Sequence, residues 1–186
     1  SIADLLTYLY CEEMKVSAED PKNPDRDRLV LSKGHAAPAL YSVLAQRGYF
    51  SPELLKILDE MGHGDELVIA DGNFPCHSVG KKSVVIRADG HGVPEILDAI
   101  LELIPLDTYT EKPVALMEVV KGDTCGTPEI WDTYEKILTK HEPTHHEIDF
   151  TERFAFYERA KGAYLIIATG EKAIYANILL KKGVVK

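Results

Sequence analysis

Short apolar runs separated by polar, glycine-containing connections dominate the chain from residue 66 onward. Five runs rich in β-branched or large apolar residues predict strands over 66–70, 83–88, 112–120, 163–170 and 174–180. Apolar residues at helical spacing predict helices over 94–104 and 153–161, and a further helix from Pro128, capped by Thr127, that turns Trp131, Tyr134 and Leu138 inward. Alternating strands and helices predict an α/β sandwich, and the pattern is equally compatible with a mixed and a parallel sheet.

The first 50 residues differ from the rest of the chain in their pattern of apolar and polar positions. Four apolar residues at helical spacing predict a helix over 2–14: Ile2, Leu5, Leu6 and Leu9. The polar stretch 17–28, with two prolines, predicts a loop or linker, and a second helix is expected from about Pro38 to Arg47. We therefore expect a mostly helical segment at 1–50 and a larger α/β domain at 51–186.

The charge and the length of the apolar runs indicate which classes of binding partner are unsuited to this chain. The net charge of −9, from 30 acidic and 21 basic residues, disfavours nucleic acid, because phosphate backbones are held mainly by clustered Lys and Arg. No apolar run approaches the roughly 20 residues of a membrane-spanning helix, so no membrane partner is expected. A neutral small molecule suits this chain better. The sequence shows no secretory signal, and we expect a cytoplasmic protein.

The cysteines suggest neither a disulfide framework nor a metal site. Cys11, Cys76 and Cys125 are far apart and form no CxxC pair. We expect reduced thiols on buried or half-buried side chains, and no bound metal.

The segment EMGHGDELVIAD, at 60–71, places His63 between two glycines directly before a strand. A helix is expected to start at Pro52 with Ser51 as its cap, and to end at Gly62, where glycine adopts the left-handed conformation cheaply. The glycines leave the imidazole accessible. His63 precedes the strand 66–70 and Asp71 ends it, so at about 3.3 Å per residue the two lie far apart along the strand and need not meet within one subunit.

Several blocks, in this order, resemble the L-fucose mutarotase and D-ribose pyranase family, and its fucose branch in particular: SPELLKILDEMGHGDELVIADGNFP, VIRADG, RFAFYERA and TGEKAIYANILLKKG. The resemblance covers residues 51–186. It implies a three-layer α/β sandwich with a mixed central sheet and a cytoplasmic enzyme that interconverts the anomers of a free monosaccharide, with L-fucose as the expected sugar. It also implies that no cofactor is needed and that the chain forms a homo-oligomer, a decamer by resemblance, with its sites at subunit contacts.

The same resemblance assigns roles to individual residues. It places the proton donor at His63 and the sugar-binding residues at Asp71, Arg153, Tyr175, Ala176 and Asn177. The chemistry of these side chains agrees with the assignment. Opening a pyranose moves a proton off the anomeric hydroxyl and another onto the ring oxygen, and histidine, with a reference pKa near 6.5, serves as acid or base near neutral pH. The carboxylate, guanidinium, phenol and amide groups can accept or donate hydrogen bonds to sugar hydroxyls.

Plainer interpretations stand beside these roles. A histidine in a glycine turn is more often a solvent-exposed turn residue, and only the flanking motifs reverse that expectation for His63. On local sequence Asp71 is as readily a turn-former, and Arg153 fits a solvated helix start. His77 either lines the pocket or anchors its loop, and Tyr157 is expected to be a half-buried core aromatic. Two further histidines, His145 and His146, are expected in a solvated connector over 139–151.

Residues 1–50 resemble the amino-terminal part of a transketolase, through SIADLLTYLY and DPKNPDRDRLVLSKGHAAPALYSVLAQRGYF. The histidine of the SKGH motif falls on His35. The GDG motif that would hold a diphosphate and magnesium is missing, so thiamine diphosphate has no anchor and His35 is expected to pack or to face solvent. Three functions therefore compete: a fucose-type mutarotase, a non-catalytic sugar-binding or assembly protein, and a fragment of a thiamine diphosphate-dependent transketolase.

Overall fold

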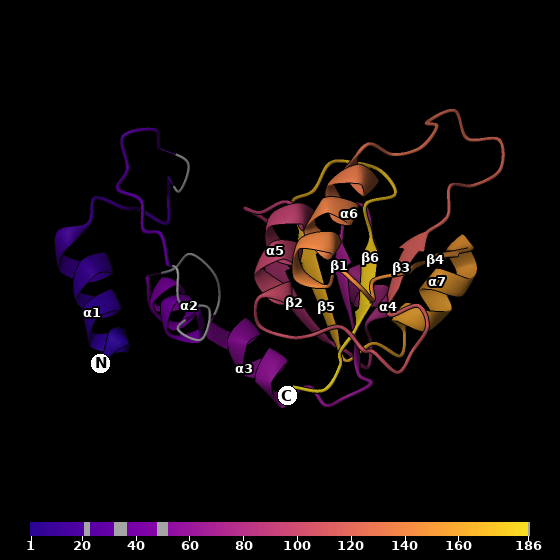
Figure 1. The fold of residues 1–186 in the computed structure, drawn as a ribbon. Coiled ribbons are helices and arrows are strands. Elements are labelled where there is room, and N and C mark those ends of the chain that lie inside the picture. The colour runs from indigo at the N-terminus through magenta and orange to yellow at the C-terminus, as the bar shows by residue number, and fades with distance from the viewer. Residues whose placement is uncertain (21–22, 32–36, 48–51, 186) are drawn as a thin grey trace. The chain divides into compact units, whose positions relative to one another are not determined.

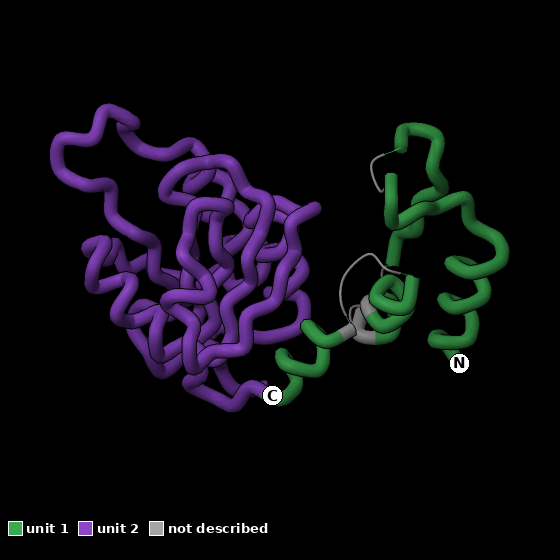
Figure 2. Tube along the Cα trace, turned by 180° about the vertical axis from the view of Figure 1, so that it is seen from behind, with its two compact units in different colours: residues 1–60 green, residues 61–186 purple. Residues whose placement is uncertain are grey.

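A computed structural model describes residues 1–20, 23–31, 37–47 and 52–185 of the chain. The chain divides into two compact units, Ser1–Glu60 and Met61–Lys186 (Figure 2). The predicted division at residues 50 and 51 stays a prediction. Among the described residues, no helix combines the length and the apolar character that crossing a bilayer requires.

The second unit is built on a six-stranded mixed sheet. Its strands are β1 (Glu66–Ala70), β2 (Val84–Ala88), β3 (Val114–Met117), β4 (Ile148–Thr151), β5 (Leu165–Thr169) and β6 (Ile178–Lys181), in the order β2-β5-β1-β6-β3-β4. β5 is parallel to β1 and β2, and β3 is parallel to β4, whereas β6 is antiparallel to both of its neighbours. The three-layer sandwich with a mixed central sheet is confirmed.

Helices cover both faces of this sheet (Figure 1). On one side lie α5 (Val93–Leu101) and α6 (Ile130–His141), and on the other lie α4 (Cys76–Val79) and α7 (Arg153–Ala160). Val68 and Ala70 of β1 join a cluster with Phe156 of α7. Because successive side chains of a strand alternate between faces, the intervening Leu67 and Ile69, which are also fully buried, belong to the opposite face. The central strands are thus apolar on both sides, as a covered sheet requires.

The residues of the first unit that the structure describes form four helical segments: α1 (Ile2–Tyr8), η1 (Leu9–Glu13), α2 (Ala37–Gln46) and α3 (Pro52–Glu60). α1 and α2 pack through a small apolar cluster that includes Leu6, Tyr10 and Val43. Cys11 is exposed, so the expectation that every cysteine is at least half-buried is wrong; the neighbouring Tyr10 occupies the covered face of the segment instead. His35 and Ser51 lie outside the described residues.

The predicted strands and helices form, with differences at their ends. The run 174–180 is a strand only from Ile178, because Tyr175 takes a positive φ of 55°, which a strand cannot contain. The helix expected from Pro128 starts at Ile130, and Thr127 does not cap it. The prediction that residues 139–151 form a solvated connector is wrong, because this stretch contains the end of α6 and the edge strand β4. His145 is half-buried, and its Nε2 donates to the Thr110 carbonyl oxygen at 2.7 Å.

Gly64, rather than Gly62, adopts the left-handed conformation before β1, with a φ of 87°. The Asp65 carboxylate accepts from the Gly62 N–H at 2.7 Å and closes the turn on itself. A left-handed residue is therefore needed inside the turn, directly after His63, and not at the helix end.

Candidate functional site

A hollow of about 440 Å³ opens at the carboxyl end of β1, where Asp71 follows the strand. Five of the residues that the sequence predicted to bind sugar or to lie near the pocket line this hollow: Asp71, Arg153, Tyr157, Tyr175 and Asn177. They come from three segments that the sheet and α7 bring together, because β1 and β6 are neighbouring antiparallel strands and α7 packs against the sheet beside them. The hollow is therefore a product of topology, since Asp71 and Asn177 are 106 residues apart.

Asp71 is buried and held on several sides. The Asn177 amide donates to Oδ2 at 2.8 Å, the Asn73 N–H donates to Oδ1 at 2.9 Å, and the Asp71 N–H donates to the Asn177 side-chain oxygen at 2.9 Å. Burial nevertheless raises the pKa of the Asp71 carboxyl above its ordinary value, against the opposing hydrogen bonds. The carboxyl accepts the turn-forming bond from the Asn73 N–H, which confirms the turn-former interpretation, and it also lines the hollow, while its role in sugar binding stays a prediction.

Arg153 begins α7, whose start is capped by the Glu152 carboxylate. The guanidinium stacks on Phe154, with Cζ 4.8 Å from the ring centroid. Among the described residues, Arg153 Nε is a buried side-chain donor without a hydrogen-bond partner. A buried, unpaired donor is costly, and this one belongs to a residue that lines the same hollow as Asp71.

Tyr157 is half-buried and packs on Phe74, with ring centroids 5.5 Å apart, as expected for a core aromatic, and it also lines the hollow. His77 is exposed and lies in α4. It lines a second hollow of about 250 Å³ that also includes Asp71 and Arg87. The two hollows share Asp71 and Phe74, and His77 lines only the second one.

The loop before β6 is fixed by α6. Trp131 Nε1 donates to the Tyr175 carbonyl oxygen at 2.8 Å, and the buried Tyr134 hydroxyl donates to the Ala176 carbonyl oxygen at 2.7 Å. These bonds hold Tyr175 in its left-handed conformation, an unusual state for a residue with a side chain, and such conformations cluster at functional sites. Ala176 is fully buried, and its backbone N–H donates to Asp71.

The Tyr175 hydroxyl is engaged within the chain. It donates to Asp123 Oδ2 at 2.7 Å and accepts from the Val120 N–H at 3.3 Å. Asp123 lines the same hollow. Tyr175 therefore ties the 120–123 segment to the hollow, and Asp123 is a lining residue that the sequence did not single out.

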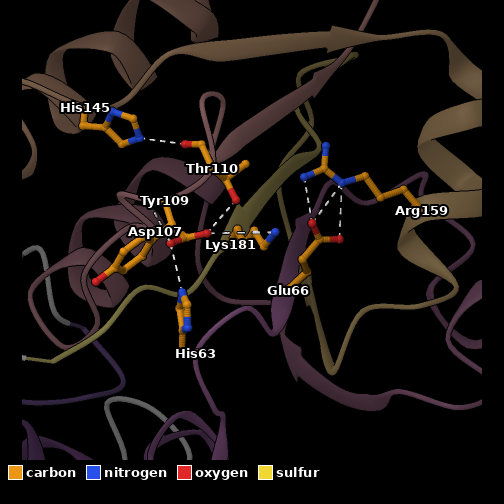
Figure 3. Close-up of polar contacts among 8 residues, drawn as sticks. All are labelled: His63, Glu66, Asp107, Tyr109, Thr110, His145, Arg159 and Lys181. Carbon is orange, nitrogen blue, oxygen red and sulfur yellow. Dashed lines mark hydrogen bonds and ion pairs between the residues drawn. The ribbon is translucent and has the colours of Figure 1, made fainter.

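His63 lies at the other end of β1, in the turn before the strand (Figure 3). Its side chain is 46% exposed, and its Nε2 lies 3.1 Å from Oδ1 of the buried Asp107. The Tyr109 ring packs beside the imidazole, with centroids 5.4 Å apart. Because a carboxylate only accepts, Nε2 carries the proton toward Asp107, and Nδ1 is left as the nitrogen that can serve a ligand.

Asp107 is the functional candidate that sequence reasoning missed. Burial disfavours its charged form, but hydrogen bonds from the Thr110 hydroxyl, the Tyr109 N–H and His63 outweigh that effect and lower its pKa to about 2. The Thr110 and Tyr109 bonds measure 2.6 and 3.0 Å. No local motif marks this aspartate, because its partner His63 is 44 residues away.

Two clusters therefore stand at opposite ends of one strand. The five residues of β1, at about 3.3 Å each, separate them by roughly 16 Å. His63 and Asp107 face one end, and Asp71, Arg153 and Asn177 face the other. Within one chain the structure does not bring His63 to the hollow.

Comparison with known proteins gives a family match for each of the two parts of the chain. Residues 45–185 match the family model described as the RbsD / FucU transport protein family, and residues 1–61 match the thiamine diphosphate binding domain of transketolase. The L-fucose mutarotase of Actinobacillus pleuropneumoniae serotype 5b (strain L20) is 51% identical over 134 residues, 72% of this chain and 91% of that protein. The Homo sapiens fucose mutarotase is 51% identical over 138 residues, 72% of this chain and 88% of that protein.

Solved structures show the same likeness. FucU from Bifidobacterium longum is 60% identical with a TM-score of 0.70, and the fucose mutarotase in complex with L-fucose from Streptococcus pneumoniae is 51% identical with a TM-score of 0.69. Each match covers 73% of this chain and 94% of the other. With a family model that spans three quarters of its length and relatives at this identity, the chain belongs to the RbsD / FucU family.

Proposed function

We propose that this chain is a fucose-type mutarotase, an isomerase that interconverts the α and β anomers of a free monosaccharide, with L-fucose as its sugar. The relatives named fucose mutarotase share about half of their residues with it, and one related structure is described as a complex with L-fucose. The net charge of −9 is in keeping with a neutral ligand.

The observation that carries the proposal is the unpaired donor of Arg153 beside the buried carboxyl of Asp71. A sugar hydroxyl both donates and accepts, so one hydroxyl can accept from Arg153 while a neighbouring hydroxyl donates to Asp71. Asn177 keeps Asp71 in place and adds amide groups to the lining. We assign Asp71, Arg153, Tyr175, Ala176 and Asn177 to sugar binding, the last three through the loop that α6 holds.

Proton transfer is assigned to His63. Ring opening needs an acid for the ring oxygen and a base for the anomeric hydroxyl, and closure on the other face reverses both transfers. Asp107, with its pKa of about 2, stays charged at neutral pH and holds His63 Nε2, which leaves Nδ1 to exchange protons with the sugar. No covalent intermediate and no cofactor are required.

A second copy of the chain would complete the site. Because His63 lies roughly 16 Å from the hollow along β1, we propose that His63 of one subunit serves the hollow of a neighbour in a homo-oligomer, expected to be a decamer. Residues 51–186 form the catalytic domain in this proposal, and residues 1–50 are an appendage with a transketolase-like sequence. Three free cysteines agree with a reducing compartment, and we place the protein in the cytoplasm.

The test is saturation-transfer NMR on equilibrated L-fucose. The protein should accelerate transfer of saturation between the α and β anomeric protons, and His63→Ala should abolish the acceleration while the circular dichroism spectrum is unchanged. His91→Ala, which removes a histidine at the start of α5, is the matched control and should retain it. Sugar binding without accelerated exchange would leave a non-catalytic sugar-binding protein, and the enzyme proposal would fall.

A further inference from the structure

The C-terminal segment Lys181–Gly183 runs between the two loops that carry His63 and Asp107. On one side the Gly64 N–H donates to the Lys182 carbonyl oxygen and the Lys182 N–H donates to the Asp65 carbonyl oxygen, both at 2.9 Å. On the other side the Asp107 N–H donates to the Lys181 carbonyl oxygen at 2.9 Å. One stretch of main chain thus spans the gap that the His63–Asp107 hydrogen bond crosses.

Lys182 adds a side-chain contact to this arrangement. The residue is only 7% exposed, and its ammonium group donates to the Met61 carbonyl oxygen, two residues before His63. Lysine is rarely buried to this extent without bonds that hold its charge. The single residue Lys182 therefore binds the turn at Met61, Gly64 and Asp65, on both sides of His63.

The Lys181–Gly183 segment also packs closely against the loop that carries Asp107. Gly183 donates its N–H to the Pro105 carbonyl oxygen at 2.8 Å, and a Cβ built on Gly183 would lie 2.2 Å from the Leu106 carbonyl oxygen. Only glycine permits that approach. The loop that carries Asp107 thus packs against the same segment that is hydrogen-bonded to the turn of His63.

We propose that Lys182 is a positioning residue for proton transfer: it clamps the His63 turn against the Lys181–Gly183 segment and so sets the geometry of His63 relative to Asp107. Lys182 reaches no part of the sugar hollow, whose lining is formed by other residues. The inference rests on the proposed mutarotase function for its kinetic consequence, and on the structure alone for its effect on the position of His63.

The experiment replaces Lys182 by Met, which keeps an unbranched stem and removes the donor. Lys161→Met, which removes an exposed lysine at the carboxyl end of α7 paired with Glu158, is the matched control. In Lys182→Met the saturating anomer-exchange rate should fall about tenfold to a hundredfold, because displacements near 1 Å are enough to cost that much in a proton transfer. The Kd for L-fucose should stay within about twofold, since binding and proton transfer use different residues.

An NMR signal distinguishes a change in the position of His63 from a general loss of protein stability. The His63 ring-proton resonances, which sense the Tyr109 ring, should shift in Lys182→Met and stay in place in Lys161→Met. Lys182→Arg, which retains a charged donor, should recover most of the rate. If the Met variant does not fold, Lys182→Gln takes its place: its uncharged amide ends one atom short of the lysine nitrogen, so the rate should fall and the His63 signals should shift as in Lys182→Met.

Wild-type exchange rate and unmoved His63 signals in Lys182→Met would overturn the inference, as would a rate loss that comes entirely from weaker L-fucose binding. If the wild-type protein itself fails to accelerate exchange, the proposed function falls. The His63 signals then decide the positioning role by themselves: displaced signals support it and unchanged signals refute it.

Discussion

Replacing Asp107 by Asn tests the charge that the structure places beside His63. The substitution keeps the shape of the side chain and removes its charge. The charged carboxylate accepts from Thr110, Tyr109 and His63, and these bonds lower its pKa from 3.8 to about 2. This lowering of the pKa corresponds to about 2 kcal/mol of unfolding free energy at pH 7.

The sign of the pH dependence follows from the direction of the shift. The folded pKa is below the unfolded one, so the contribution is fully present well above pH 3.8 and is lost as the pH falls toward about 2. At pH 3 linkage leaves about 1 kcal/mol of the contribution. The difference in unfolding free energy between wild type and Asp107→Asn should therefore shrink by about 1 kcal/mol between pH 7 and pH 3.

The assay is urea unfolding followed by circular dichroism at both pH values, at one fixed protein concentration because assembly contributes to apparent stability. Carboxyl NMR titration of the wild type gives the Asp107 pKa directly. In parallel, the anomer-exchange rate of the variant should fall at least a hundredfold, because an amide can donate to Nε2 and favour the wrong tautomer of His63. A stability difference that is the same at pH 7 and pH 3, or a titration near pH 4, would refute the reasoning.

Three further predictions concern assembly, binding and the outer helices. His63→Ala and Asp71→Ala should each be inactive alone, yet after co-expression random mixing restores about a quarter of the wild-type exchange rate, because one intact His63 can serve one intact hollow of a neighbour; no recovery would place both residues in one subunit's site. Arg153→Met should raise the Kd for L-fucose at least tenfold with an unchanged circular dichroism spectrum, since a donor is lost from the hollow, and an unchanged Kd by calorimetry would remove Arg153 from the site. Burial opposes the charge of Asp98, yet bonds from Lys140 and His141 lower its pKa, so Asp98→Asn should cost up to about 1 kcal/mol above pH 5 and progressively less below pH 3.8; an equal cost at every pH by urea unfolding would contradict this.

Local sequence predicted the elements well where the signal is itself local. The apolar run at 66–70 is a strand buried on both faces, and the helices α5 and α7 form where helical spacing places apolar residues. The left-handed residue was assigned to Gly62 although it is Gly64, because the choice depends on which N–H the Asp65 carboxylate takes. The edge strand β4 was missed, since its residues gain strand structure only by pairing with β3.

Some residues of the candidate site could likewise be predicted from the sequence, and others could be found only in the structure. Motif resemblance gave His63, Asp71, Arg153 and Asn177, and the structure brings the last three to one hollow. No pattern along the chain indicated Asp107 or Lys182. Both act on the His63 turn, and they are 44 and 119 residues from His63 along the chain.

The sequence by itself determined the α/β class, the position of every strand except β4 and the residue types able to bind a sugar and move a proton, because these depend on periodicity and side-chain chemistry. Only the tertiary structure decided which of those residues meet. Antiparallel β6 returns Asn177 to Asp71 and Lys182 to the His63 turn at opposite ends of the same strand pair, and that placement depends on strand order and register. The spacing along the strand already separated His63 from Asp71, but only the folded sheet shows that Arg153 and Asn177 lie with Asp71 at the end away from His63.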